Sequence, residues 1–325
     1  MRLIKIFCLI LCVQSYCSAQ KVEILTSGTK ASLRGLSVVS NQVFWASGSN
    51  GKVARSTNGG ASIQWITVPG YEKRDFRDIK AYDSNTAIIM AVAEPGIILK
   101  TKDGGKNWVT VFADSTKGMF LDAMDFSGRK GVVIGDPINN RLFRAYTNDG
   151  GDHWTIDTLT PTLAKGEAFF AASGTNINAL SGYYVSGGLQ SSLYLKDQPI
   201  LLPLKQGKES TGANSIALYK KKAVISGGDF SSDKDSSGNC ILVDLSGKPV
   251  FSHPQTAPHG YRSCVIYLDQ NKLISCGTSG IDISKDGGKN WELISTESFH
   301  VVQKAKKGSK IYFAGAGGRI ASLQW

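Results

Sequence analysis

A short phrase recurs along this chain and constrains its fold: a hydroxyl residue, a variable residue, Asp-Gly-Gly, two further residues and Trp. The full copies contain Asp103 with Trp108, Asp149 with Trp154, and Asp286 with Trp291, and a looser copy contains Asn58 and Trp65. From Asn58 to Asp103 is 45 residues, from Asp103 to Asp149 is 46, and from Asp149 to Asp286 is 137, which is three such steps. A fixed period of this length is typical of a repeat architecture.

Each period divides into four short apolar runs separated by turn residues. In the period at 75–111 the expected strands are 76–81, 86–93, 97–101 and 108–112. Strands this short, at such regular spacing, are typical of an all-β protein. Four strands in 40–50 residues predict one blade of a β-propeller.

The number of blades follows from the same period. Six periods occupy 33–68, 75–111, 119–157, 167–204, 213–253 and 260–295, and the phrase has decayed in the fourth and fifth of them. The remaining segment, 299–325, has room for three strands, and the segment 21–25 supplies a fourth, which would close the ring and remove an open sheet edge. The sequence therefore predicts an all-β, seven-bladed β-propeller with four-stranded antiparallel blades, closed by the N-terminal strand.

The repeated phrase itself is expected to stabilise the fold. Asp accepts hydrogen bonds from its own loop, the glycines supply positive φ, and Trp buries a large apolar area. No copy offers more than two carboxylates where a calcium loop needs several, so we predict no metal. The predicted structural residues are Asn58, Asp103, Trp108, Asp149, Trp154, Asp286 and Trp291.

The N-terminus has the pattern of a secretory signal peptide. Arg2 and Lys5 precede the apolar run 6–13, and the small residues Ser18 and Ala19 follow. This pattern predicts a signal peptide at 1–19, a single domain at 20–325, and a secreted or periplasmic, cell-envelope location without a transmembrane segment. A lipoprotein alternative through Cys17 is disfavoured by the bulky Tyr16 before it.

The net charge of the chain indicates which classes of partner it binds. Without 1–19 the chain has 35 basic and 26 acidic residues, which favours an acidic protein segment, acidic glycan or anionic lipid as partner. No nucleic-acid-binding motif is present.

Three cysteines lie outside 1–19, namely Cys240, Cys264 and Cys276, which is an odd number. Cys264 and Cys276 flank an expected hairpin turn symmetrically, so a cross-strand contact between them is one interpretation, and buried, unpaired thiols on strands are the favoured one.

The phrases resemble Asp-box repeats, also called bacterial neuraminidase repeats. Over nearly the whole chain after the signal, the pattern resembles the propeller family of photosystem II stability/assembly factors and its relatives in non-photosynthetic bacteria. The resemblance implies a propeller fold and, as a type of role, an assembly factor. The same repeat occurs in sialidases and sorting receptors, so it indicates fold more strongly than function.

A ligand site is expected on the face opposite the phrases. There, the start of each innermost strand meets the loop between the second and third strands, and a charged, concave mouth results. The innermost strands supply Arg34, Arg77, Asp122, Asn214, Arg262 and His300, and the loops supply Glu94, Asp136 and Asp229. The predicted binding residues are Arg34, Arg77, Arg262, Glu94, Asp136, Asp229 and His300.

Two functions fit this mouth. In the first, which we favour, a monomeric, non-enzymatic ring without cofactor grips a carboxylate of an acidic partner through arginine. In the second, a sialidase-like hydrolase would use the set Arg34, Arg77 and Arg262, with Glu94 or Glu167 and Tyr71 or Tyr261. The Arg-Ile-Pro signature of sialidases is absent, and no catalytic residue is assigned. A redox enzyme fits less well, because the glycines at 315–318 lead to a strand rather than a helix.

Overall fold

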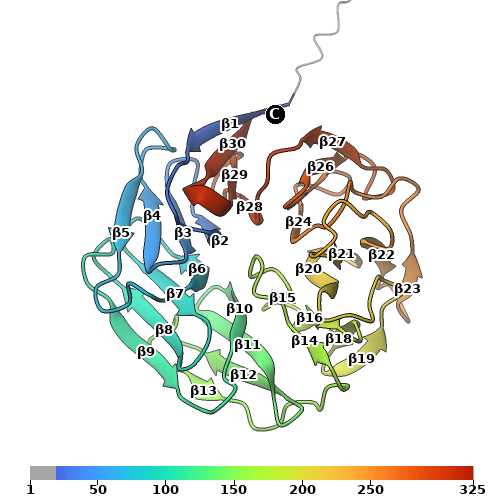
Figure 1. The fold of residues 1–325 in the computed structure, drawn as a ribbon, viewed down its shortest axis with the longest axis horizontal. Coiled ribbons are helices and arrows are strands. Elements are labelled where there is room, and N and C mark those ends of the chain that lie inside the picture. The colour runs from blue at the N-terminus through green and yellow to red at the C-terminus, as the bar shows by residue number, and fades with distance from the viewer. Residues whose placement is uncertain (1–19, 325) are drawn as a thin grey trace, which may run out of the picture.

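The computed structural model describes residues 20–324, which form a ring of seven antiparallel β-sheets around a central axis (Figure 1), and we call the region along this axis the channel. The predicted seven-bladed propeller is confirmed. The signal peptide predicted for 1–19 lies outside the described residues. Within 20–324, none of the helical segments has the length and apolar character needed to cross a membrane.

Blades 1 to 3 are regular, with each strand paired to the next in chain order. Blade 1 contains β2 (Leu33–Val38), β3 (Phe44–Gly48), β4 (Lys52–Ser56) and β5 (Gln64–Thr67). Blade 2 contains β6 (Phe76–Ala81), β7 (Ala87–Ala91), β8 (Gly96–Thr101) and β9 (Val109–Asp114). Blade 3 contains β10 (Leu121–Ser127), β11 (Lys130–Ile138), β12 (Arg141–Thr147) and β13 (Thr155–Ile156).

Blades 6 and 7 complete the ring. Blade 6 contains β24 (Cys264–Tyr267), β25 (Leu273–Gly277), β26 (Gly280–Ser284) and β27 (Glu292–Ser295). Blade 7 contains β28 (Val301–Lys304), β29 (Ile311–Ala314), the short 3₁₀ turn η1 (Ala316–Gly318), β30 (Ile320–Gln324) and β1 (Lys21–Thr26). Strand β1 pairs antiparallel with β30, so the predicted closure by the N-terminal strand is confirmed (Figure 1).

Blades 4 and 5 are the irregular part of the ring. Blade 4 contains β15 (Ile177–Asn178), β16 (Tyr183–Val185), β18 (Ser192–Leu195) and β19 (Gln198–Leu201). Blade 5 contains β20 (Thr211–Tyr219), β21 (Lys222–Asp229), β22 (Cys240–Asp244) and β23 (Val250–Ser252), extended by the short strands β14 (Glu167–Ala168) and β17 (Gly187–Gly188).

The predicted fourth blade thus begins later than its period suggests. Its first residues, in β14, pair with β17 and belong to the sheet of blade 5. Between β14 and β15 the chain runs along the channel, and we call residues 168–174 the channel segment. It is fixed to blade 6, because the Ser173 hydroxyl donates to the Ser263 carbonyl at 2.7 Å. It also passes close to blade 2, where a side chain at Gly174 would collide with Asp78.

The core lies between consecutive blades rather than at the centre of the ring. One cluster joins Trp45 and Val53 of blade 1 to Ile89 and Leu99 of blade 2. Burial of these sheet faces against their neighbours supplies the main driving force for closing the ring.

The repeated phrases form four similar turns, at residues 56–62, 101–107, 147–153 and 284–290, which we call the Gly-Gly turns. In the second, the Thr101 hydroxyl accepts from Gly105 N at 3.0 Å and donates to Asp103 Oδ1 at 2.9 Å. Asp103 Oδ1 also accepts from Asn107 N at 2.9 Å. These hydrogen bonds, those from Asn107 first, lower the pKa of Asp103 to about 2. The turn therefore satisfies its own polar groups, as the sequence predicts.

Each Gly-Gly turn also contacts the preceding blade. Gly105 has a φ of +87°, and a Cβ placed on it would lie 2.6 Å from Ile66 Cδ1 of blade 1. Trp108 follows and packs into the cluster shared by blades 1 and 2, with its indole N–H donating to the Gly105 carbonyl at 3.1 Å. The turns therefore hold neighbouring blades together.

Cys264 and Cys276 lie directly opposite each other on β24 and β25. Both are fully buried, and both are free thiols, like Cys240. The interpretation favoured from the sequence, buried and unpaired thiols on strands, is confirmed. These thiols act as small apolar groups in the core of blade 6.

Candidate functional site

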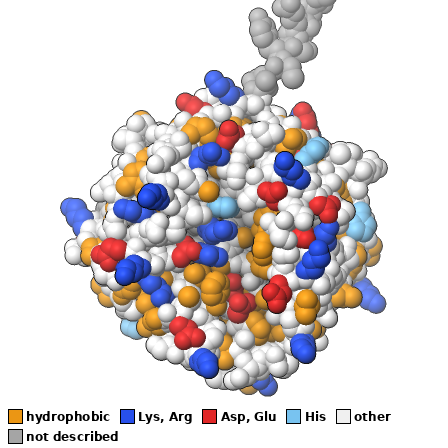
Figure 2. Space-filling model, viewed as in Figure 1, with side chains coloured by type: hydrophobic (Ala, Val, Ile, Leu, Met, Phe, Trp, Pro, Cys, Tyr) orange, Lys and Arg blue, Asp and Glu red, His pale blue; other side chains and the backbone are white. Residues whose placement is uncertain are grey.

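A pocket of about 480 Å³ opens at one mouth of the channel. It lies where the innermost strands begin. The Gly-Gly turns follow the third strand of a blade, which runs in the same direction as the first, so these turns lie at the opposite face of the ring. In Figure 2, basic, acidic, histidine and hydrophobic side chains all lie around the hollow at the centre of the ring. The polar residues of the pocket are Arg34, Arg77, Asp122, Asp136, Asn214, Thr278 and His300, together with Tyr261.

Four of these side chains occupy the same special position in their blades. The pairing between the first two strands shifts register at Arg34 in blade 1, Arg77 in blade 2, Asp122 in blade 3 and Asn214 in blade 5. Such a bulge leaves one residue outside the ladder and redirects its side chain. The bulges explain why residues at strand starts point into the channel.

Arg34 and Arg77 make the mouth basic. Arg77 Nε is 2.8 Å from Asp75 Oδ2, and its guanidinium lies over the Phe120 ring at 6.0 Å. Within residues 20–324, Arg34 has no ion pair, and burial, followed by the nearby Arg77 charge, lowers its pKa. Among the described residues, Arg34 is thus a partly buried cation without an ion-pair partner, a state that favours binding of an anion.

The two carboxyl groups of the pocket do not cancel this charge. Burial, and then the neighbouring Asp136, raises the pKa of the fully buried Asp122 well above its usual range. Burial also raises the pKa of Asp136, which accepts a hydrogen bond from Phe169 N at 3.0 Å. Both environments disfavour negative charge, and Asp136 holds the channel segment at the mouth.

His300 lines the same pocket as the two arginines and contacts Ser32. Its Nε2 is 3.3 Å from the Ser32 hydroxyl. Burial, followed by the charges of Arg34 and Arg77, lowers the pKa of His300 to about 3. The imidazole is therefore neutral at physiological pH and offers a hydrogen bond without adding charge.

One wall of the pocket is aromatic and was not predicted from the sequence. It is formed by Phe120, Phe169, Phe170 and Phe230, with Tyr261 beside them. Phe170 and Phe230 meet edge to face at 5.8 Å, and Phe230 is 49% exposed. An exposed phenylalanine directly after β21, in the loop between second and third strands, is the sequence signal that could have revealed this wall.

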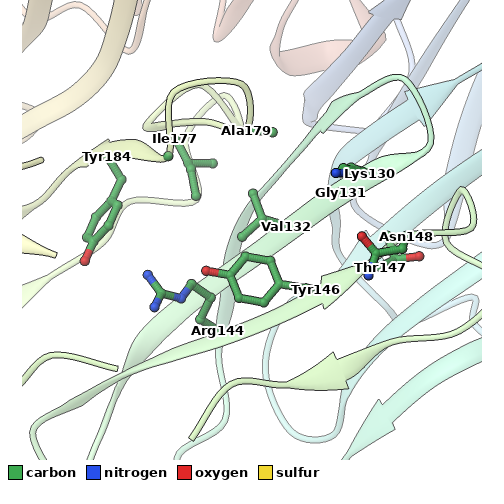
Figure 3. A pocket seen from close by; sticks show the side chains of 11 residues that line it. Lys130, Gly131, Val132, Arg144, Tyr146, Thr147, Asn148, Ile177, Ala179 and Tyr184 are labelled. Carbon is green, nitrogen blue, oxygen red and sulfur yellow. The ribbon is translucent and has the colours of Figure 1, made fainter. Parts of the chain in front are cut away.

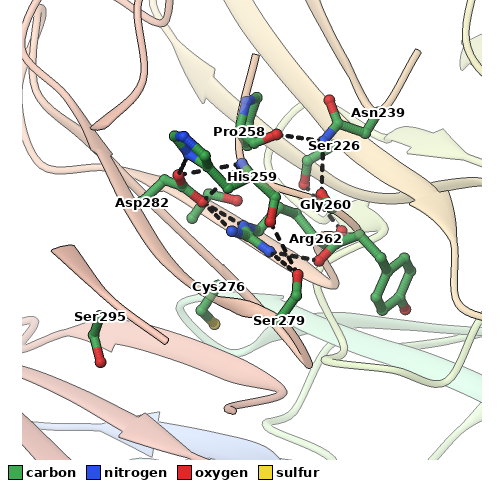
Figure 4. A network of polar contacts seen from close by, with 12 residues as sticks. Ser226, Asn239, Pro258, His259, Gly260, Arg262, Cys276, Ser279, Asp282 and Ser295 are labelled. Atoms are coloured by element: carbon green, nitrogen blue, oxygen red, sulfur yellow. Dashed lines mark hydrogen bonds and ion pairs between the residues drawn. The ribbon is translucent and has the colours of Figure 1, made fainter. Parts of the chain in front are cut away.

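Arg262, predicted to join the mouth, does not line the pocket. Its fully buried guanidinium pairs with the fully buried Asp282 of β26, with Nε at 2.6 Å from Oδ2, and also donates to the Ser279 hydroxyl at 2.7 Å (Figure 4). Asp282 also bonds His259 Nδ1 at 2.6 Å. Strand β24 pairs without a bulge and begins after Arg262, so nothing redirects this side chain into the channel.

Glu94 and Asp229 also lie outside the pocket. Glu94 is exposed in the loop between β7 and β8, and its carboxylate accepts from Gly118 N. Asp229 is buried and accepts from the Ser231 hydroxyl at 2.6 Å, with Lys208 Nζ at 3.7 Å. Of the seven predicted binding residues, the structure brings together Arg34, Arg77, Asp136 and His300.

The residues considered for a hydrolase do not assemble. Arg262 is paired with Asp282 and does not line the pocket that holds Arg34 and Arg77, and the buried Glu167 accepts from Ser186 and from Ala164 N. Tyr71 bonds Thr110 at 3.0 Å. Tyr261 reaches the pocket, where its hydroxyl donates to Asn214 Oδ1 at 2.8 Å.

Comparison with known proteins gives the same fold at low sequence identity. No family model matches the chain. It is 19% identical over 247 residues, 75% of this chain and 70% of the relative, to the photosystem II assembly lipoprotein Ycf48 of Synechococcus sp. (strain CC9902).

Solved structures extend the similarity to nearly the whole ring. YCF48 bound to D1 peptide superposes with a TM-score of 0.65 at 16% identity, covering 94% of this chain and 97% of that one. YCF48 from Cyanidioschyzon merolae gives 0.67 at 14% identity, covering 94% and 99%. The Pan2 WD40 domain of Neurospora crassa gives 0.59 at 11% identity, covering 90% and 89%. These likenesses establish the propeller fold.

Proposed function

We propose that this protein is a non-enzymatic, assembly-factor-like propeller that binds a carboxylate-bearing segment of a protein partner at the channel mouth. The observation that carries the proposal is Arg34, a partly buried guanidinium without an ion pair within the described residues, beside Arg77. A guanidinium in this setting favours a carboxylate, which it can bind through two parallel hydrogen bonds.

The aromatic wall fits the rest of such a segment. Phe120, Phe170 and Phe230 offer an apolar surface within the same pocket as the arginines. Aromatic side chains at the centre of a concave surface commonly supply much of the binding energy for a peptide. The similarity to YCF48, which one solved structure shows bound to a D1 peptide, supports a protein segment as the type of ligand.

The proposal is tested with short immobilised peptides that combine an apolar residue with either a free C-terminal carboxylate or an amide, and with either acidic or neutral side chains. The protein is expected to bind the carboxylate-bearing peptides and to lose at least tenfold in affinity as Arg77→Glu. Lys285→Glu, the same charge reversal on the opposite face, is expected to bind as the unmodified protein does. Binding that is indifferent to carboxylate and to Arg77→Glu would reject the mouth as the site.

A hydrolase remains the second function to test. A panel of aryl-glycosides, including sialosides, is expected to stay intact. Turnover that Arg34→Ala abolishes would replace the binding function with catalysis at the same pocket.

We further infer that the Gly-Gly turns are Asp-box repeats with a structural role, and that the chain is exported after removal of residues 1–19. The turn geometry supports the first, since in all four turns the Ser or Thr hydroxyl donates to the side-chain oxygen of the Asp or, in the first turn, of Asn58. Sequencing the N-terminus of the protein recovered from the cell envelope tests the second. A chain that starts at Gln20 is expected, and a chain that keeps Met1 would contradict export by cleavage.

A further inference from the structure

The Gly-Gly turns show how this fold receives a tryptophan between blades. In blade 6, Gly288 and Trp291 lie against Val224 and Leu242 of blade 5, which face each other across β21 and β22. Trp291 is 3% exposed, and its indole N–H donates to the Gly288 carbonyl at 3.0 Å. The turn supplies its own acceptor, so the preceding blade needs only to offer a cross-strand apolar pair.

The junction of blades 3 and 4 has the same pair but no tryptophan. The equivalent cross-strand pair on β11 and β12 is Val132 and Tyr146. The β18–β19 turn of blade 4 consists of Lys196 and Asp197, both with positive φ, in place of a Gly-Gly turn. Asp197 replaces the apolar contact with a polar one, since it accepts from Arg144 of blade 3 at 2.6 Å and from the Tyr184 hydroxyl at 2.8 Å.

Because the short turn of blade 4 brings no tryptophan to this junction, a groove of about 330 Å³ remains between blades 3 and 4 (Figure 3). Val132, Tyr146 and Arg144 form one side, and Ile177, Ala179 and Tyr184 form the other. The Arg144 guanidinium lies over the Tyr146 ring at 5.3 Å, and Tyr146 is 41% exposed. Thr147 and Lys130 place the groove on the face of the Gly-Gly turns, opposite the mouth pocket.

The basic residues that line the groove indicate which charge a bound partner carries beside its aromatic side chain. Lys130, the first residue of β11, lines the groove, is exposed, and forms no ion pair within residues 20–324. Arg144 is already paired with Asp157 and Asp197, at 2.7 and 2.6 Å, so it offers an occupant the flat face of its guanidinium rather than an unpaired charge. An acidic residue close to the aromatic one would therefore pair with Lys130.

We propose that the groove between blades 3 and 4 binds a tryptophan side chain presented by a protein partner beside an acidic residue. The Gly-Gly turns of this same chain have that composition, with an Asp five residues before the Trp. The partner's tryptophan takes the place that Trp291 takes between blades 5 and 6. This site is separate from the mouth, and its success or failure does not depend on the function proposed there.

The probe is an acetylated, amidated peptide with the sequence of residues 284–291, Ser-Lys-Asp-Gly-Gly-Lys-Asn-Trp, carrying 5-fluorotryptophan. Its fluorine NMR signal is expected to broaden on addition of the protein. An unlabelled copy should displace it, and a copy with Ala in place of Trp should compete at least tenfold less well. A copy with Asn in place of Asp should compete more weakly and should respond less to Lys130→Ala.

The groove is located with Ala179→Trp, which fills it from within, and the matched control Leu159→Trp on an exposed position. Broadening is expected to vanish with Ala179→Trp and to persist with Leu159→Trp, with both variants melting as the unmodified protein does. Tyr146→Ala, which removes one wall, gives an independent loss if Ala179→Trp fails to fold. Absence of broadening at millimolar protein, equal competition by the Ala peptide, or broadening that survives both groove variants would overturn the proposal.

Discussion

The face of the ring that carries the Gly-Gly turns and the face that carries the mouth pocket use the same blades differently. On the first, Asp103 and Gly105 have counterparts of nearly the same kind in three other blades, each making the same contacts. On the second, equivalent bulges carry Arg34, Arg77, Asp122 and Asn214, four positions with three different chemistries. Repetition marks what stabilises the junctions that carry these turns, and variation at a shared position marks what the binding site alone requires.

The largest loss of stability is expected at Trp291, on the face of the Gly-Gly turns. Trp291→Ala removes a buried indole from the junction of blades 5 and 6 and should lower the free energy of unfolding by about 3–5 kcal/mol. Urea denaturation measures it, with Lys289→Ala, an exposed neighbour in the same turn, as control. A loss no larger than that of Lys289→Ala would remove the structural role assigned to the turns.

Gly105→Ala should act on the same face with a smaller effect. A side chain at φ +87° is strained, and its Cβ would press on Ile66 of blade 1. We expect a loss of about 1–3 kcal/mol, the usual range for a residue held in an unfavourable backbone region. Gly247→Ala, where the added Cβ would meet open space, is the matched control. If the two variants unfold at the same urea concentration, the turn does not hold the blades together through this contact.

Much of the fold and part of the candidate site can be predicted from the sequence, and three examples show where prediction succeeds and fails. The strand at 76–81 was predicted with its observed bounds, because turn residues delimit it and its period is fixed by the Gly-Gly turns. Arg262 was assigned to the mouth, yet it faces Asp282, because its direction depends on the missing bulge in β24. Phe169 and Phe170 were missed because the channel segment leaves the blade period, which local pattern does not reveal.

The stability of the protein should depend on pH through His300, with a smaller effect than that of the two substitutions above. Its folded pKa of about 3 lies below the value of 6.5 for the free side chain, so between pH 6.5 and 3 the unfolded chain binds a proton that the folded chain does not. This histidine therefore reduces stability as pH falls through that window. His300→Asn should flatten the dependence of Tm on pH between 6.5 and 4.

The control for His300→Asn is the same substitution at the exposed His253. Subtracting the two profiles removes the contribution of the raised carboxyl pKa values at Asp122 and Asp136. A Tm profile for His300→Asn that runs parallel to that of the unmodified protein would show that His300 is solvated rather than enclosed in the pocket with Arg34 and Arg77.

The smallest effect is expected for charge pairs outside both sites. Lys285 and Glu292 are exposed and 3.3 Å apart on the turn face. Lys285→Ala should change the free energy of unfolding by less than about 0.5 kcal/mol, since exposed pairs contribute little. A loss comparable to that of Gly105→Ala would mean that surface charge, as well as the turns themselves, holds this face together.

The most direct test of the account combines both faces in one experiment on Arg34→Ala/Arg77→Ala. Affinity for carboxylate-bearing peptides and the urea midpoint are measured on the same preparation, with Trp291→Ala alongside. The account predicts that the arginine variant loses at least tenfold in affinity and keeps its midpoint, while Trp291→Ala loses midpoint and, where folded, keeps affinity. An arginine variant that binds as before, or that loses affinity only because it unfolds, would contradict the separation of stability and binding between the two faces.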